Sequence, residues 1–391
     1  MDNTKISYKE WILVIGTCLA PLTGFRIWKI GPGEALCFFY CILNYRNIRY
    51  ISRDNIFLRF WLPFLCVSFL GTIWGIIMYP YETKAIGLFT WVYLATISIS
   101  ISCALMNLEA HEIEIIVERC AALSTSLYAI LFVFSKSIAA SLFGVPLWYG
   151  GVRYTAGATN PHQIALMLSF SIIVFGHRIL NSKLNIIKLK CVALLLIAYY
   201  LLFQTKSSTA IMATCVATVV FVTYSIWKNA ENKRLVLVVY SIGILFFIFF
   251  VSKDFYKFVV SWIEDDPNGQ GRFVLFASFP TAFFKSPIIG LGPGTHARNG
   301  VMEFHNSYLE FISMAGLLGA GVFIILSVRL FKTAFNSPLS LGVLVSGYMF
   351  GVSGFGARRL VYWVLVVLCY ELASKLNNKV TISKSFLYIR C

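Results

Sequence analysis

The chain has 391 residues, of which 58% are hydrophobic and 13% are charged, and its 33 Lys and Arg oppose 17 Asp and Glu. Soluble domains carry about 25% charged residues, so a water-soluble globule is excluded. The hydrophobic residues form continuous runs long enough to cross a bilayer as helices, whereas the strands of a membrane β-barrel would alternate in polarity. The composition therefore predicts an all-α, polytopic membrane protein.

Hydrophobic runs separated by charged residues or by Gly and Pro predict about twelve transmembrane helices. Their centres lie near residues 17, 39, 67, 95, 125, 168, 197, 218, 243, 318, 345 and 366. An even number places both termini on one side of the membrane. The basic linkers 46–53, 177–190 and 228–234 fall on that side, which the positive-inside rule assigns to the cytoplasm. The linker 107–114 is expected there too, although it has no Lys or Arg.

The net charge of +16 is therefore a topology signal, and we expect no binding of nucleic acid. Most of the ten cysteines lie in hydrophobic runs, which is typical of buried free thiols. Cys37 and Cys41 are one helical turn apart, but no cluster of His or carboxylate residues accompanies them. We expect neither a metal site nor a cofactor.

Two long loops are predicted on the non-cytoplasmic side, at residues 137–160 and, between the ninth and tenth spans, at residues 252–304. Loops of more than about 15 residues in a compact protein are usually functional or disordered. The second loop is too hydrophobic for disorder, so we expect it to fold back on the bundle as a cap that carries part of an active site. Residues 1–391 are thus treated as one integral membrane domain with two large periplasmic loops.

Polar residues near hydrophobic spans are costly unless they are used or paired, so polar stretches on the loop side are the candidate sites. Four stretches qualify. They are 150–168, with Arg153, Asn160 and His162; 204–210, with Lys206 and Ser207; 269–276, with Arg272; and 290–321, with His296, Arg298, His305, Asn306, Tyr308 and Glu310. Within the last stretch, the spacing of Gly316 and Gly319 predicts close helix packing.

The order of these stretches resembles a known family. RYTAGATNP at 153–161, KSSTA at 206–210, Arg272 followed by KSPIIGLGPGTH at 285–296, and HNSYLEFISMAGLLGA at 305–320 are similar to motifs of the O-antigen polymerase and O-antigen ligase superfamily of Gram-negative envelopes. The resemblance covers most of the chain in layout and residues 150–321 in motifs. It implies a GT-C-like helical bundle in the bacterial inner membrane, with both termini cytoplasmic and the active site periplasmic.

The resemblance also implies the reaction, which is metal-independent transfer of a glycan from undecaprenyl pyrophosphate to a sugar hydroxyl. The implied partners are that donor, a lipid-linked or lipid A core glycan acceptor and membrane lipids, and the family allows a chain-length regulator. Without a metal, cations must stabilise the pyrophosphate leaving group, and the planar fork of arginine suits phosphate oxygens.

The motif positions give each candidate residue a role. Arg153 and Arg272 match the arginines of the family and are assigned to the pyrophosphate, with interfacial anchoring as the alternative. His305 matches the loop histidine and is the expected general base, with a packed or capping histidine as the alternative. The expected substrate-binding residues are Lys206, which departs from the more usual Arg, and Asn160, His162, Ser207, Arg298, Asn306, Tyr308 and Glu310. Arg358 and Arg359 are interpreted as surface or headgroup contacts.

Three function classes fit this layout: a glycosyltransferase, a transporter such as a flippase for lipid-linked oligosaccharides, and a membrane scaffold. A carrier should place charges inside its spans and show paired broken helices, and here the charges gather on one face. We therefore predict glycosyl transfer. Polymerase and ligase need the same leaving-group stabilisation and the same base, so the motifs do not separate them. The Phe, Ile and Lys bias indicates an AT-rich gene, as is common for O-antigen clusters, and favours the polymerase.

Overall fold

The fold is a bundle of helices, seen in a computed structural model that describes residues 6–27, 30–49, 55–80, 87–229, 275–293, 304–354 and 356–388. It is 79% helical, which confirms the predicted all-α class. In chain order the elements are α1 (Tyr8–Leu19), η1 (Thr23–Phe25), α2 (Pro32–Leu43), α3 (Tyr45–Arg49), α4 (Ile56–Met78), α5 (Gly87–Leu105), α6 (Ala110–Ser137), β1 (Ser141–Leu142), β2 (Val145–Pro146), β3 (Trp148–Tyr149), β4 (Arg153–Tyr154), α7 (Pro161–Asn181), α8 (Asn185–Gln204), α9 (Ser208–Asn229), α13 (Phe279–Lys285), α14 (Ser307–Ala334), α15 (Pro338–Ser353), η4 (Gly356–Arg358) and α16 (Leu360–Tyr388).

Every predicted span centre that falls in the described part of the chain lies on a helix, and the centre near residue 243 lies outside it. Of the described helices, eight are long and apolar enough to cross a membrane. By contrast, α1 and α2 have 12 residues each. Such a helix is about 18 Å long, shorter than a hydrocarbon core of about 30 Å. These two helices form a short antiparallel pair. Near the start of α1, Lys9 Nζ donates to the carbonyl of Leu43, the last residue of α2, at 3.3 Å.

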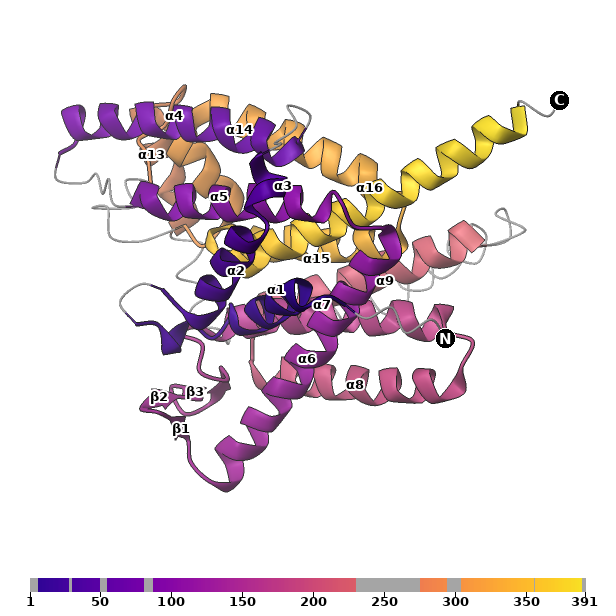
Figure 1. The fold of residues 1–391 in the computed structure, drawn as a ribbon. Coiled ribbons are helices and arrows are strands. Elements are labelled where there is room, and N and C mark those ends of the chain that lie inside the picture. The colour runs from indigo at the N-terminus through magenta and orange to yellow at the C-terminus, as the bar shows by residue number, and fades with distance from the viewer. Residues whose placement is uncertain are drawn as a thin grey trace, which may run out of the picture.

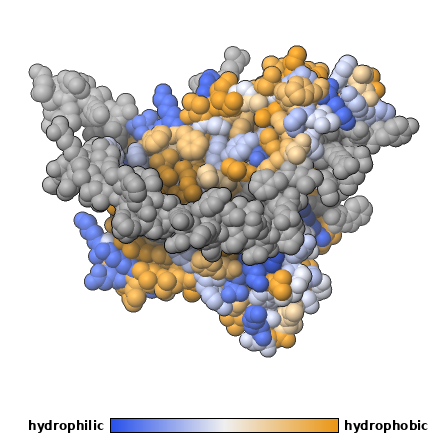
Figure 2. Space-filling view, turned by 180° about the vertical axis from the view of Figure 1, so that it is seen from behind, coloured by the Kyte–Doolittle hydropathy of each residue, from blue (hydrophilic) through white to orange (hydrophobic). Residues whose placement is uncertain are grey.

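The outside of the bundle is hydrophobic. Helix α8 exposes Ile186, Leu189 and Leu196, and α14 exposes Leu317 and Ile324. Figure 2 shows broad hydrophobic areas on the face that it presents. Large exposed hydrophobic patches mark contact with a membrane or a partner, and their occurrence on helices of this length fits a lipid-facing surface.

The two ends of the bundle differ in charge and in structure, and Figure 1 shows the short strands at one of them. At one end, here called the basic end, Lys228 Nζ donates to the carbonyl of Asn336 at 2.5 Å, and Lys375 Nζ to that of Met106. The linker 107–114 lies at this end as well, because Met106 directly precedes it and its Glu114 lies 3.4 Å from His177 of α7. One turn further along α6, Glu118 pairs with Arg178 of α7 at 3.1 Å, so acidic side chains at the start of α6 lie against the basic end of α7.

The opposite end, here called the hairpin end, carries two antiparallel hairpins, β1–β2 and β3–β4, between α6 and α7. The segment between β4 and α7 is tied to the turn after α1 by two contacts. Thr23 Oγ1 lies 2.8 Å from Thr159 Oγ1, and the N–H of Gly24 donates to the carbonyl of Gly157 at 2.9 Å. The start of α7 is thereby fixed against the first helical pair, on the side of the bundle where the polar motifs gather.

Helix α14 is broken at Gly316, where φ is 59° and ψ is −159°. The segment after α13 fills the break with its backbone. The N–H groups of Leu291 and Gly292 donate to the carbonyls of Ser313 and Met314 at 3.1 and 3.0 Å, and the N–H of Leu317 donates to Pro287 at 2.8 Å. Irregular backbone within a membrane bundle is tolerated where protein groups satisfy it. Gly316 does allow a close approach, but its neighbour is the backbone of Ile288 in the inserted segment and not a second helix, because this glycine breaks α14.

Aromatic side chains pack beneath the hairpin end and hold α4, α5, α14 and α16 together. The rings of Trp61 and Trp363 are 4.6 Å apart, and those of Phe311 and Phe323 are 4.4 Å apart. Trp363 Nε1 also donates to the carbonyl of Ala357 at 2.6 Å. This core therefore supports both the start of α14 and the η4 turn, the two segments that carry the polar groups described next.

Candidate active site

The first group of candidate residues gathers at the start of α7. Asn160 caps this helix, since its side chain accepts the N–H of His162 at 2.9 Å. His162 Nδ1 lies 2.6 Å from Ser207 Oγ, which belongs to the turn between α8 and α9. Ser207 is fully buried. The structure therefore brings the first two predicted stretches together and gives Asn160 a capping role.

Arg153 and Lys206 lie beside this contact. Arg153, on β4, donates from Nε to the carbonyl of Thr205 at 3.2 Å, which directs its side chain towards the turn between α8 and α9. Lys206 occupies that turn, is exposed and has φ of 47°. Arg153 and Lys206 are thus two cations beside the turn that precedes α9. The first backbone N–H groups of α9 lie next to them and also favour an anion.

The second group lies at the start of α14. Asn306 caps the helix by accepting the N–H groups of Tyr308 and Leu309, at 2.9 and 3.0 Å. Its amide also donates to the carbonyl of Val352 at 2.7 Å. Tyr308 Oη donates to the carbonyl of Tyr348 at 2.6 Å. Asn306 and Tyr308 therefore fix the start of α14 against the end of α15.

His305 and Glu310 differ in exposure. His305, immediately before the cap, is exposed and has φ of 51°. Glu310 is buried, at 1% exposed, one turn into the helix. Positive φ is uncommon for residues other than glycine. It persists where the surrounding structure holds the backbone in that conformation, often at functional sites. His305, Lys206 and Ala156 share this property, and all three lie in the predicted motifs.

A continuous set of contacts links the two groups. The ring of His162 packs edge-on against that of Phe350 in α15, with centroids 6.1 Å apart. Phe350 packs in turn against Gly354 and Gly356 at the η4 turn. Ser307 Oγ donates to the carbonyl of Gly354 at 3.1 Å. The histidine beside Arg153 and the helix start that carries His305 are therefore parts of one region at the hairpin end.

A third group was not expected from the sequence. Arg26, just after η1, forms an ion pair with Glu34 at the start of α2, and its Nε donates to Glu34 Oε1 at 3.2 Å. Arg358 is the last residue of η4 and Arg359 follows it, and both side chains are partly exposed. Burial lowers the pKa of Arg358 and lowers that of Arg359 to about 10, with a smaller contribution from the charges of Arg358 and Arg26. The interpretation of the two arginines as surface or headgroup contacts stays a prediction.

The sequence signal for this third group is weak. Arg26 and Glu34 are eight residues apart in a short linker, and the paired arginines stand near the other end of the chain. Only the folded bundle places them together. With Arg153 and Lys206, they make the described part of the hairpin end strongly cationic, which suits an anionic ligand.

Some predicted residues lie outside the described part of the chain, namely Arg272, His296 and Arg298. Their predicted roles stay predictions, as do those of the loop 252–304 as a whole. Among the described residues, no group of three or more His, Cys, Asp and Glu side chains is placed to hold a metal ion.

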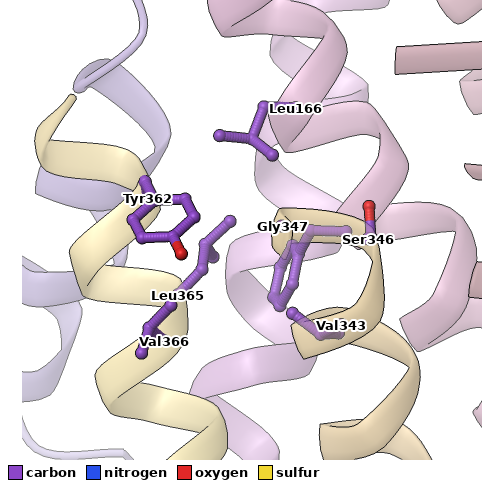
Figure 3. A pocket seen from close by; sticks show the side chains of 8 residues that line it. Leu166, Val343, Ser346, Gly347, Tyr362, Leu365 and Val366 are labelled. Carbon is purple, nitrogen blue, oxygen red and sulfur yellow. The ribbon is translucent and has the colours of Figure 1, made fainter. Parts of the chain in front are cut away.

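A small cavity lies inside the bundle between α7, α15 and α16 (Figure 3). Its volume is about 10 Å³, roughly the space of one water molecule. Leu166, Val343 and Leu365 line it, and Ser346 in its wall is bonded to Ser169 at 2.5 Å. The cavity is too small for a sugar or a lipid chain.

Comparison with known proteins supports the resemblance seen in the motifs. Residues 191–324 match the family model of O-antigen ligase. This segment covers α8, α9, α13 and most of α14, and so includes Lys206, Ser207 and His305. No curated protein matches the chain. Over residues 191–324, the chain is thus similar to the O-antigen ligases, which supports its resemblance to the O-antigen polymerase and ligase superfamily.

Proposed function

We propose that this protein is an O-antigen polymerase of the bacterial inner membrane, which joins lipid-linked repeat units at the periplasmic face. The observation that carries the proposal is the position of Arg153 and Lys206 beside the contact between His162 and Ser207. Phe350 and the η4 turn connect this contact to the start of α14, where His305 stands within the segment that matches O-antigen ligases. Anion-binding groups and a candidate base on one face of a membrane bundle suit a reaction between membrane-anchored glycans.

In the proposed reaction, His305 removes the proton from a hydroxyl of the acceptor sugar. The hydroxyl oxygen attacks the anomeric carbon of the donor glycan, and the bond from that carbon to the pyrophosphate oxygen breaks. The electron pair leaves with undecaprenyl pyrophosphate, whose negative charge Arg153, Lys206 and Arg272 stabilise. Each cation acts most strongly as the leaving group forms, which is where electrostatic stabilisation lowers the barrier.

Arg153→Lys is expected to reduce the rate of transfer by about 10- to 100-fold although the charge is kept. Lysine cannot form the bidentate contact to phosphate, and a hydrogen bond between charged groups contributes about 1.5–3 kcal/mol. Lysine would also lose the Nε contact that holds the side chain against Thr205. The measurement is polymer formation by the purified protein with lipid-linked repeat units.

The matched control for this variant is Lys183→Gln. Lys183 is an exposed cation between α7 and α8, outside the motifs and outside the segment that matches the family. We expect its activity to equal that of the wild type. Full activity of Arg153→Lys together with loss in Arg153→Ala would show that charge alone is needed, and the bidentate contact would be rejected.

An O-antigen ligase, which transfers the finished polymer to the lipid A core, is the second candidate, because the family description is that of the ligases. Deleting the gene separates the two. If the protein is the polymerase, cells with a separate ligase keep a lipid A core capped by a single repeat unit. Bare core together with accumulated lipid-linked polymer, seen on a lipopolysaccharide gel, would assign the ligase instead.

A lipid-linked oligosaccharide transporter is a weaker candidate. Helix α14 is broken, but its break is filled by the protein's own segment 286–292. Transporters of inverted-repeat design use matched broken helices around a site at the middle of the membrane. Transfer of glycan in detergent, where no compartment exists, would exclude transport as the activity.

A further inference from the structure

The hairpin β1–β2 carries a large exposed side chain at the tip of its turn. Only two residues lie between Leu142 and its partner Val145. They are Phe143, with φ of 50°, and Gly144, with φ of 78°. A two-residue turn with positive φ at both positions favours Asn followed by Gly, because most other side chains are strained there. The Phe143 side chain is 92% exposed, so neither the turn nor the protein core explains a phenylalanine at this position.

The segment around this turn has no charged residue. Residues 137–152 contain no Asp, Glu, Lys or Arg, whereas Lys136 and Arg153 stand directly before and after them. Tyr149, in the second hairpin, is exposed together with Phe143. Exposed hydrophobic side chains in a segment without charge suit contact with lipid, because a charged group is costly there.

The hairpin also continues a surface that faces lipid. Helix α6 is long and apolar enough to cross a membrane, and Ile130 and Val133 are exposed on it, one turn apart near its end. Ile138, directly after α6, is exposed as well. Figure 1 shows α6 running obliquely to α7 and α8, with the short strands beyond its end at the edge of the bundle. The lipid-facing side of α6 therefore leads to the hairpin.

A lysine and a tryptophan mark the level of the hairpin in the membrane. Lys136 Nζ lies over the Trp148 ring at 4.1 Å. Tryptophan is enriched where a membrane meets water, and a lysine near a helix end extends towards the headgroups. Open strand edges do not occur within the hydrocarbon, because their backbone groups would be unsatisfied. A hairpin at this level keeps its backbone among the headgroups, from which the side chain of Phe143 reaches the acyl chains.

The two hairpins form one unit that includes Arg153. The N–H of Leu147, between β2 and β3, donates to the carbonyl of Ala140 at 2.9 Å. The carbonyl of Leu147 accepts the N–H of Thr155 at 3.0 Å. Arg153 itself is paired with Tyr149 in the register of β3 and β4. Backbone hydrogen bonds therefore couple the position of the β1–β2 turn to that of Arg153.

We propose that the hairpin β1–β2 is a membrane anchor, whose Phe143 side chain inserts between the acyl chains of the phospholipids around the hairpin end. The anchor holds the two hairpins at a fixed depth and thereby keeps Arg153 at the level of the lipid phosphates. This role in positioning Arg153 rests on the proposed function, in which Arg153 binds a diphosphate linked to a membrane lipid. The insertion of Phe143 does not depend on it.

Relaxation of a fluorine label tests the insertion without requiring turnover. Phe143 is replaced by trifluoromethylphenylalanine in the full-length protein, which is placed in nanodiscs of phosphatidylcholine for fluorine NMR. One sample contains a phospholipid with a nitroxide near the top of its acyl chain, and another contains a water-soluble gadolinium chelate. We expect the lipid nitroxide to relax this label more strongly than gadolinium does.

Two other positions calibrate the measurement. A label in place of Phe69, an exposed residue of the span α4, should respond to the lipid nitroxide, and a label in place of Lys183 should respond to gadolinium. A label at Phe143 that behaves like the one at Lys183 faces water and overturns the proposal. Protection from both reagents would show contact with a protein or a glycan, and would overturn it as well.

Phe143→Asn removes the anchor but keeps the turn, because Asn is favoured at this position of the turn. In nanodiscs, glycan transfer by this variant should fall about tenfold, the factor expected when one large apolar side chain loses its burial. Phe143→Leu, which still inserts, should keep the wild-type rate. In detergent, where no bilayer surface fixes the depth, all three proteins should be equally active.

The outcomes separate the anchor from its role and from the proposed function. An equal loss of activity in detergent would show that Phe143 acts through the folded protein, contrary to the proposal. A wild-type rate of Phe143→Asn in nanodiscs would reject the role in positioning Arg153. Insertion of the label in a protein that transfers no glycan would reject the proposed function but not the anchor.

Discussion

Replacing His305 by alanine is expected to reduce glycan transfer by about 10²- to 10⁴-fold, the usual cost of losing a general base. The side chain is exposed, so its removal leaves no internal cavity. The start of α14 is held independently of it, by the cap of Asn306 and by the bond from Ser307 to Gly354. The measurement is the rate of polymer formation by purified protein, alongside its thermal unfolding temperature.

His111→Ala is the matched control for this experiment. His111 is also exposed and lies at the basic end, 3.4 Å from Glu109. We expect this variant to retain wild-type activity. A His305→Ala protein with a normal unfolding temperature and a near-normal rate would remove His305 from the proposed mechanism, and another group would have to accept the proton.

Replacing Gly290 by alanine is expected to destabilise the protein strongly, because the inserted segment leaves no room for a side chain. A Cβ at this position would lie 2.3 Å from the carbonyl carbon of Met314, which is backbone of the broken helix. The φ of Gly290 is 69°, a conformation that costs other residues about 1–2 kcal/mol. Displacement of the packed segment adds about 1–3 kcal/mol.

The comparison variant for Gly290→Ala is Gly321→Ala. Gly321 lies on the same helix, and a Cβ there would have open space around it. Alanine at this position should be neutral or should stabilise the helix by about 0.5–1 kcal/mol. Both variants are measured by thermal unfolding in detergent. Equal unfolding temperatures for the two would contradict the tight fit of segment 286–292 against α14.

Much of the candidate site could be predicted because its residues lie in short motifs next to helix starts. Asn160 and Asn306 stand where helices begin after polar stretches, and both are caps in the structure. The motifs did not indicate which residue each of these side chains contacts. The contact between His162 and Ser207 joins α7 to the turn after α8, and the anchoring of α14 depends on Val352 and Gly354.

The sequence by itself determined the class of the fold and, within the described residues, the places of its long apolar helices. A bilayer allows few structures, since every backbone group must be satisfied within a helix or a closed barrel, and hydropathy is therefore a strong signal. Only the tertiary structure decided which helix is broken and which residues far apart in the sequence are in contact. Gly316 breaks its helix because segment 286–292 satisfies the freed backbone groups. Lys375 reaches the carbonyl of Met106 because α16 packs against α5, and no local pattern encodes a contact between residues so far apart in the sequence.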